Sequence, residues 1–398
     1  MNMQVPSAQV LPDDYRNALL VGRVFDPVAG GPAVVIARGD ELIDVTHIEP
    51  TVSMLLERAD LSELLVNAES DRTWRLDEVL RATLDQDYDR AHLLAPVDLQ
   101  VIKAAGVTFV QSMLERVIEE RSAGEPARAE AIRTQLDEVI GTAIGNVRPG
   151  TPEAAAVKEI LIREGLWSQY LEVGIGPDPE IFTKAPVLSA VGTGAAIGVL
   201  ARSTWNNPEP ELALAVTSTG KPVGAMLAND VNLRDFEGRS ALLLTEAKDN
   251  NASCALGPFI RIFDDSFTLQ IARSLDIELR VTGTADKFEM NGTSSMSAIS
   301  RDLLDLIHHA WGPHHQYPDG FVLLTGTLFA PTQDRGEAGA GFTHHEGDRV
   351  SISSPKLGAL INTVTSSETA PDWVFGISSL MRNLASRGLL PAREEVTA

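Results

Sequence analysis

The stretch WNNPEPELALAV occupies residues 205–216 and decides how the centre of this chain folds. Its apolar run at 212–216 predicts a buried β-strand. The prolines before it cannot donate ladder hydrogen bonds, which suits a strand opening or an edge. Glu209 and Glu211 are two residues apart, so on an extended strand both carboxylates point to one face. Two such carboxylates repel each other unless a cation lies between them, and a hard divalent cation is the economical partner. A solvated acidic strand edge is the alternative interpretation.

A second strand is predicted at 223–227, and Asp230 follows its end. Asp230 would complete a three-carboxylate site for Mg²⁺, which takes about six ligands and would leave about three positions for water and substrate. Lys248 stands in the polar run 247–251. A lysine beside such a site can bind a carboxylate or move protons. A surface lysine in a polar loop is the alternative.

Thr325-Gly326-Thr327 ends an apolar strand, and a glycine between two hydroxyl residues lets a ligand approach the backbone closely. A plain strand end fits this pattern equally well. The glycine-rich run at 192–198 lacks the spacing of a dinucleotide fingerprint. The adjacent histidine pairs lack zinc-ligand spacing, so we expect them in loops or on the surface.

Strands and helices do not alternate regularly along the chain, which argues against a doubly wound parallel sheet. We expect an α+β fold with a mixed, β-rich core and peripheral helices. Apolar spacing predicts helices at 110–120, 127–144 and 152–171, and a short apolar run predicts a strand at 241–244.

The first 92 residues are expected to form a small α/β domain, and residues 93–398 the catalytic domain. Short apolar runs around glycine-containing turns predict a small strand meander near the N-terminus, followed by two short helices. The polar and charged stretch at 69–90 is the expected boundary between the two domains.

The chain has 398 residues, of which 33 are basic and 55 acidic, giving a net charge of −22. This charge, without a Lys/Arg run, argues against nucleic-acid and anionic-membrane partners. An anionic substrate would need positive charge gathered at its site. The single cysteine, Cys254, cannot form an intrachain disulfide. No secretory signal or transmembrane stretch is visible, so we expect a cytoplasmic protein.

Several motifs, taken in order, resemble the fumarylacetoacetate hydrolase superfamily over roughly residues 93–365. They are residues 178–184, 209–211, 229–235, Lys248, 293–300 and 325–327. The whole chain is more similar still to one branch, the 2-keto-3-deoxy-pentonate dehydratases of non-phosphorylative xylose and arabinose catabolism. The stretches 166–174, 236–240 and 315–320 carry this closer likeness.

The resemblance implies a fumarylacetoacetate hydrolase-like catalytic core in which Glu209, Glu211 and Asp230 bind Mg²⁺, with Mn²⁺ as a possible substitute. It also implies a homo-oligomer, either a dimer or a tetramer. One departure bears on the reaction. Hydrolases of the superfamily typically carry a His-x-x-Glu pair where this chain has Ser112 and Glu115. Serine without a partner cannot activate water as a base, so the departure favours lyase chemistry over C–C hydrolysis.

The expected reaction is the dehydration of a 2-keto-3-deoxy-pentonate to 2,5-dioxopentanoate. Glu180 is the expected base at C3, Lys248 would polarise the 2-oxo side or shuttle a proton, and Glu115 would lie near the C4 hydroxyl. The expected substrate-binding residues are Ser112, Arg116, Lys184, Asn232 and Thr327. Two alternatives remain open: a metal-dependent acylpyruvate C–C hydrolase or oxaloacetate decarboxylase, and a non-catalytic sugar-acid binder.

Overall fold

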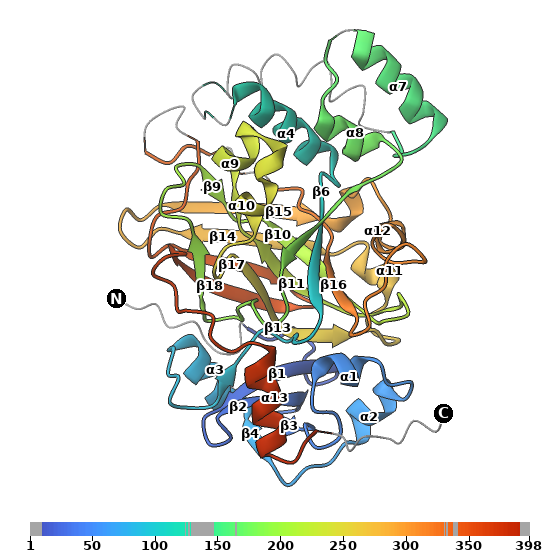
Figure 1. Cartoon of the computed structure of the whole chain (residues 1–398). Coiled ribbons are helices and arrows are strands. Elements are labelled where there is room, and N and C mark those ends of the chain that lie inside the picture. Colours follow the sequence, from blue (N-terminus) through green and yellow to red (C-terminus); the bar gives the residue numbers. More distant parts are fainter. Residues whose placement is uncertain are drawn as a thin grey trace.

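The structure, a computed structural model, describes residues 10–123, 125, 128, 147–163, 165–329, 331, 333–336 and 341–390, without the side chains of Gln111 and Glu119. No helix in these ranges is long and apolar enough to cross a membrane. The strands form two sheets and a short ribbon, and most helices gather at two opposite ends of the molecule (Figure 1).

The large sheet has eleven strands in the order β4-β3-β2-β1-β13-β11-β10-β16-β6-β7, with β5 paired to β1. Its strands are β1 (Leu20–Asp26), β2 (Gly31–Arg38), β3 (Glu41–Asp44), β4 (Thr73–Arg75), β5 (His92–Leu93), β6 (Val101–Gly106), β7 (Glu180–Ala185), β10 (Pro210–Val216), β11 (Pro222–Asp230), β13 (Cys254–Ile262) and β16 (Phe321–Leu324). Only the β16–β6 pair in this sheet is parallel within the described residues. β10 and β11 lie in its middle, and both are buried over most of their length.

A smaller sheet has the strand order β15-β14-β17-β18-β8. Its strands are β8 (Ala196–Val199), β14 (Asp276–Thr282), β15 (Glu289–Ser295), β17 (Arg349–Ser354) and β18 (Gly358–Ser366). The ribbon consists of β9 (Asn206–Asn207) and β12 (Asn232–Leu233). The two sheets share one hydrophobic core, in which Leu212 and Leu227 of the large sheet meet Leu279 and Ile352 of the smaller one.

The helices fall into groups by position (Figure 1). The helices around β1–β4 are α1 (Val52–Leu56), α2 (Leu61–Asn67), α3 (Leu76–Leu84) and α13 (Ile377–Ser386). At the other end of the molecule lie α4 (Val110–Ser122), α7 (Pro152–Arg163), α8 (Gln169–Ile175) and α9 (Arg234–Arg239). Beside the sheets lie α10 (Leu244–Lys248), α11 (Leu269–Ala272) and α12 (Leu303–Ala310). Helix α4 packs against α8 and α9.

The predicted α+β class is confirmed, because a mixed, β-rich core carries its helices on the outside. The N-terminal strands extend the large sheet, since β1 pairs with β13 through Leu20 opposite Arg261 and Val21 opposite Ile260. Main-chain hydrogen bonding therefore runs without a break from the first 92 residues into the rest of the chain. The domain boundary at residue 92 stays a prediction.

The polar stretch at 69–90, which stays a prediction as the domain boundary, contains β4 and α3, because Leu76, Val79 and Leu80 bury one helical face between charged neighbours. One local prediction, the strand at 241–244, is wrong. The apolar run at 241–244 is helical rather than extended, since a 3₁₀ turn at Ala241–Leu243 leads directly into α10. Ser240 caps this turn by accepting a hydrogen bond from the Leu242 N–H. A short apolar run does not distinguish a strand from a helix by periodicity alone.

The helix predicted at 110–120 is confirmed as α4. The predicted helix at 152–171 is two helices, α7 and α8. Gly165 between them has a φ of +68°, which interrupts helical geometry. Ser168 then starts α8 by accepting a hydrogen bond from the Tyr170 N–H. The helix predicted at 127–144 falls outside the described residues except at position 128.

Candidate metal and substrate site

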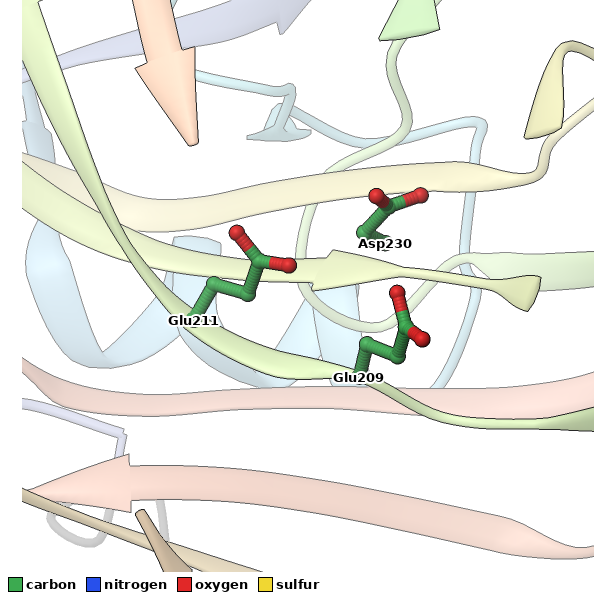
Figure 2. Close-up of side chains that lie close together, drawn as sticks. All are labelled: Glu209, Glu211 and Asp230. Carbon is green, nitrogen blue, oxygen red and sulfur yellow. The ribbon is translucent and has the colours of Figure 1, made fainter. Parts of the chain in front are cut away.

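Three buried carboxylates meet where β10 begins and β11 ends. Pro210 lies opposite Asn229 in the antiparallel pair, and the Asp230 N–H donates to the Glu209 carbonyl at 3.1 Å, so the two strands stay in register up to the site. One oxygen from each of Glu209, Glu211 and Asp230 lies within 4.8 Å of the others. Their side chains converge from the two neighbouring strands (Figure 2). They form the only group of three or more such ligands in the described ranges.

Backbone contacts hold Glu211 in place. The Gly326 N–H donates to Glu211 Oε2 at 2.7 Å. Gly326 has a φ of +92°, and a Cβ at this position would lie 2.0 Å from Thr108 Oγ1. Only glycine can therefore bring this backbone N–H so close to the carboxylate. Neighbouring Asn229 supports the site in a similar way, because its Oδ1 accepts the Glu209 N–H at 3.1 Å.

Two buried lysines compensate the charge of Asp230. Lys248 Nζ lies 3.1 Å from Asp230 Oδ2 and 2.5 Å from Glu209 Oε2. Lys184 Nζ lies 2.8 Å from Asp230 Oδ1 and donates to the Val231 carbonyl at 3.0 Å. Burial of Asp230 opposes its ionisation, but the two ammonium groups outweigh burial and hold the pKa of Asp230 below its usual value. Burial likewise opposes the charge on Lys248, yet the surrounding carboxylates raise its pKa.

Glu211 has the opposite electrostatics. Burial, and then the charges of Asp230 and Glu209, raise the pKa of Glu211 well above its ordinary value. Such a group accepts a cation readily, because the cation removes the repulsion between the three carboxylates. The donor set consists of carboxylate oxygens, which suits a hard divalent ion such as Mg²⁺ or Mn²⁺. The residues present therefore fit the expected metal.

Glu180 reaches the same pocket from β7. It lies opposite Gly106 in the β6–β7 pair, and a Cβ on residue 106 would lie 1.9 Å from Glu180 Oε2. The missing side chain makes room for the carboxylate. Burial raises the pKa of Glu180, while the nearby charge of Arg116 counteracts part of this rise.

Arg116 reaches into the pocket from α4 and binds two carboxylates. One terminal nitrogen of its guanidinium lies 2.7 Å from Glu209 Oε1, and the other lies 2.6 Å from Glu237 Oε2. Glu237 belongs to α9, is buried and lines the pocket. It was missed by the reasoning from sequence, although residues 236–240 already marked the likeness to the dehydratase branch. Its place on a short helix after Asp230 is the signal that could have found it.

Most of the residues expected to form the site line one pocket. These are Ser112, Arg116, Glu180, Glu209, Glu211, Asp230, Lys248 and Thr327. Three others, Glu115, Lys184 and Asn232, are not part of the pocket lining. Lys184 lies behind Asp230 and is fully buried. Asn232 is also fully buried, and its amide group finds no hydrogen-bond partner among the described atoms.

The Glu115 carboxylate lies beside Arg234 rather than in the pocket. Arg234 approaches Glu115 Oε2 at 3.2 Å and donates to the Pro331 carbonyl at 3.1 Å. Its guanidinium also stacks 4.3 Å from the ring centre of Trp205. Glu115 therefore links α4 to the start of α9, which carries Glu237 on its next turn.

Comparison with known proteins points in the same direction as the geometry. The chain is 34% identical over 186 residues to 2-dehydro-3-deoxy-D-arabinonate dehydratase of Saccharolobus solfataricus, and this match covers 47% of the chain but only 58% of that relative. It is 26% identical over 338 residues to the probable 2-keto-3-deoxyxylonate dehydratase of Haloferax volcanii, which covers 85% of the chain and 97% of that relative.

The fold is shared with a solved structure of 2-keto-3-deoxy-D-arabinonate dehydratase complexed with magnesium and 2,5-dioxopentanoate. The TM-score is 0.61 at 23% identity, covering 87% of this chain and 99% of that one. Residues 169–365, which include Glu180, the three carboxylates and Lys248, match the model of the fumarylacetoacetate (FAA) hydrolase C-terminal family. Residues 169–365 of this chain thus form a fumarylacetoacetate (FAA) hydrolase C-terminal domain.

Proposed function

We propose that this protein is a Mg²⁺-dependent dehydratase that converts a 2-keto-3-deoxy-pentonate, derived from D-xylonate or arabonate, to 2,5-dioxopentanoate. The observation that carries the proposal is one pocket lined by the three buried carboxylates, by Lys248 and by the carboxylate of Glu180. The names of the two relatives, both dehydratases of this substrate class, support it.

The overall reaction removes one water and needs no oxidant or reductant. A proton leaves C3, its electron pair forms the C3–C4 double bond, and the C4 hydroxyl departs with a proton as water. The unsaturated 5-hydroxy acid that remains moves a proton from C5 to C3 and becomes the C5 enol. This enol then passes its hydroxyl proton to C4 and becomes 2,5-dioxopentanoate. A divalent cation held by Glu209, Glu211 and Asp230 would polarise the 2-oxo group and so acidify the C3 protons.

Glu180 is the base that this account assigns to C3. Burial raises the pKa of Glu180, so its carboxylate is a stronger base than an exposed glutamate and works closer to neutral pH. The same carboxyl group, once protonated, can protonate the departing C4 hydroxyl. Lys248 carries an ammonium at the pocket surface and would stabilise negative charge that develops on the 2-oxo side.

The remaining pocket residues would hold the substrate. Thr327 follows the Gly326 N–H that binds Glu211 and is assigned to the C1 carboxylate. Ser112 and Arg116 lie one turn apart on α4 and are assigned to the C4 hydroxyl end. The Ser112 hydroxyl donates to the Phe109 carbonyl at 2.8 Å. A serine bonded in this way is a poor base for water, which supports dehydration over hydrolysis.

The proposal places the enzyme in the cytoplasm as a homodimer or homotetramer, with no nucleic-acid partner. Cys254 is buried, and burial raises the pKa of its thiol to about 12. This cysteine therefore stays an inert thiol in a reducing compartment. The oligomer is supported by the family resemblance alone, and sedimentation of the purified protein would test it.

The test is a coupled assay with both C4 epimers of 2-keto-3-deoxy-pentonate. The purified protein is incubated with Mg²⁺, and the semialdehyde is oxidised by an NAD⁺-dependent aldehyde dehydrogenase. NADH should form only when protein, metal and substrate are all present. Pyruvate released from an acylpyruvate, or CO₂ from oxaloacetate, with no NADH from either epimer, would instead assign the protein to C–C hydrolysis or decarboxylation.

A further inference from the structure

Glu237 is joined to the metal-binding carboxylates through a single guanidinium. Arg116 contacts Glu209 with one terminal nitrogen and Glu237 with the other, at 2.7 and 2.6 Å. All three residues line the pocket. The Glu237 side chain is only 3% exposed. One planar guanidinium therefore bridges Glu237 to Glu209, with a different terminal nitrogen on each carboxylate.

The pocket holds an excess of negative charge. Its lining contributes five carboxylates, from Glu180, Glu209, Glu211, Asp230 and Glu237, against three cations: Arg116 and Lys248 in the lining and Lys184 directly behind Asp230. A divalent cation together with Lys184 and Lys248 would compensate the three metal-binding carboxylates and favour the carboxylate of a 2-oxo acid beside them. The rest of the lining would keep Glu180 and Glu237, whose oxygens accept hydrogen bonds and repel anions.

We propose that Glu237 is a specificity-determining residue that selects 2-oxo acids with a neutral, hydroxylated tail and excludes those that end in a second carboxylate. Its oxygens would accept hydrogen bonds from tail hydroxyls. Its charge also keeps the facing side of Arg116 occupied, so that Arg116 does not attract a distal carboxylate. This inference rests on the proposed function for the placement of the 2-oxo acid at the metal.

The test compares two unreactive probes of equal length, 2-oxopentanoate and 2-oxoglutarate, which differ only in a terminal methyl against a terminal carboxylate. Their dissociation constants are measured by calorimetry on the full-length protein with saturating Mg²⁺. Two like charges a few ångströms apart repel strongly at a protein surface, so we expect 2-oxoglutarate to bind roughly tenfold or more weakly than 2-oxopentanoate.

The variant Glu237→Gln removes the charge but keeps an oxygen that can accept from Arg116. This variant should bring the two dissociation constants within about threefold of each other, chiefly because 2-oxoglutarate binds more tightly. The Arg116 charge that Glu237 had compensated can then attract the distal carboxylate. Glu278→Gln, at an exposed position of β14, is the matched control and should keep the wild-type ratio. A merely structural role of Glu237 would weaken both probes alike and leave the ratio unchanged.

Equal affinities of the wild-type protein for the two probes would overturn the inference, and so would an unchanged ratio in Glu237→Gln. The wild-type comparison needs no variant, so the inference stays testable if Glu237→Gln does not fold. The outcome is separable from the proposed function. A protein that excludes 2-oxoglutarate but dehydrates neither pentonate epimer would contradict the function and not the role of Glu237. A protein that dehydrates an epimer but binds both probes equally would contradict the role of Glu237 and not the proposed function.

Discussion

Glu180 lies directly opposite Gly106 in the β6–β7 pair, and its carboxylate occupies the space that a side chain on residue 106 would fill. A Cβ there would lie 1.9 Å from Glu180 Oε2, closer than any non-bonded contact allows. The proposed base therefore depends on a glycine in the neighbouring strand.

Gly106→Ala should displace the Glu180 carboxylate without touching the metal-binding residues. A displacement of about 1 Å is enough to lower kcat by roughly a hundredfold, while the affinity for Mg²⁺ stays at the wild-type value. The measurement is steady-state kinetics together with calorimetric Mg²⁺ titration. Gly376→Ala is the control, because a Cβ on Gly376 would meet no atom within 4 Å. A wild-type kcat in Gly106→Ala would contradict the claim that the position of the Glu180 carboxylate determines the rate.

Glu180→Gln should lower kcat by about 10³-fold, the usual contribution of a general base, and leave Mg²⁺ binding unchanged. The base must be ionised, so the rate should fall as pH drops through its pKa. Because burial raises the pKa of Glu180 above its ordinary value of 4.5, the acidic limb of kcat/KM should lie above pH 4.5. A pH profile of the wild-type enzyme tests this, and a flat rate down to pH 4.5 would speak against Glu180 as the base.

Asp230→Asn should weaken Mg²⁺ binding by about a hundredfold or more, since even residues that only support metal ligands change affinity by 10- to 100-fold. Calorimetry on the variant measures this directly. Unchanged metal affinity in both Asp230→Asn and Glu209→Gln would contradict the assignment of the metal site.

Mg²⁺ should raise the melting temperature of the wild-type protein more at pH 8 than at pH 5. The pKa of Glu211 in the folded state is raised, so its contribution favours folding below its unfolded pKa and is lost as pH rises through the folded pKa. The bound cation removes the repulsion behind this loss. Saturation to a hundred times Kd stabilises a protein by about 2.7 kcal/mol. Differential scanning fluorimetry measures the shift, and a larger shift at pH 5 would contradict the charge model.

Lys184→Met separates two roles for a residue expected from sequence to bind substrate. Lys184 is fully buried against Asp230 and does not line the pocket. Removing one partner of a buried ion pair typically costs about 3 kcal/mol or more. The variant should therefore lose stability in urea unfolding and bind Mg²⁺ more weakly. A variant of normal stability whose only defect is a raised KM would show that Lys184 contacts substrate instead.

The centre of the site could be predicted because it follows from strand geometry. Glu209 and Glu211 precede and begin a strand of obvious apolar character, and Asp230 ends the next strand, so a simple antiparallel hairpin brings them together. The side chains that face away from the pocket could not be predicted in this way. Glu115, Lys184 and Asn232 stand within motifs whose other members line the pocket, and only packing decides that Glu115 contacts Arg234 and Lys184 lies behind Asp230.

The fold class followed from the irregular order of strands and helices, but the strand order did not. The pairing of β1 with β13 joins residues about 240 positions apart, and no local pattern signals so distant a contact. Helix α3 was overlooked because charged residues separate its buried positions, although Leu76, Val79 and Leu80 follow helical spacing.

The most direct test of the central claim is to follow a complete reaction by NMR. The wild-type protein and Mg²⁺ are mixed with 2-keto-3-deoxy-D-xylonate, and in parallel with its C4 epimer, and all products are quantified. We predict that at least one epimer is converted stoichiometrically to 2,5-dioxopentanoate, with no reaction after Mg²⁺ is chelated. Pyruvate and glycolaldehyde from cleavage of the carbon chain, or no consumption of either epimer, would contradict it.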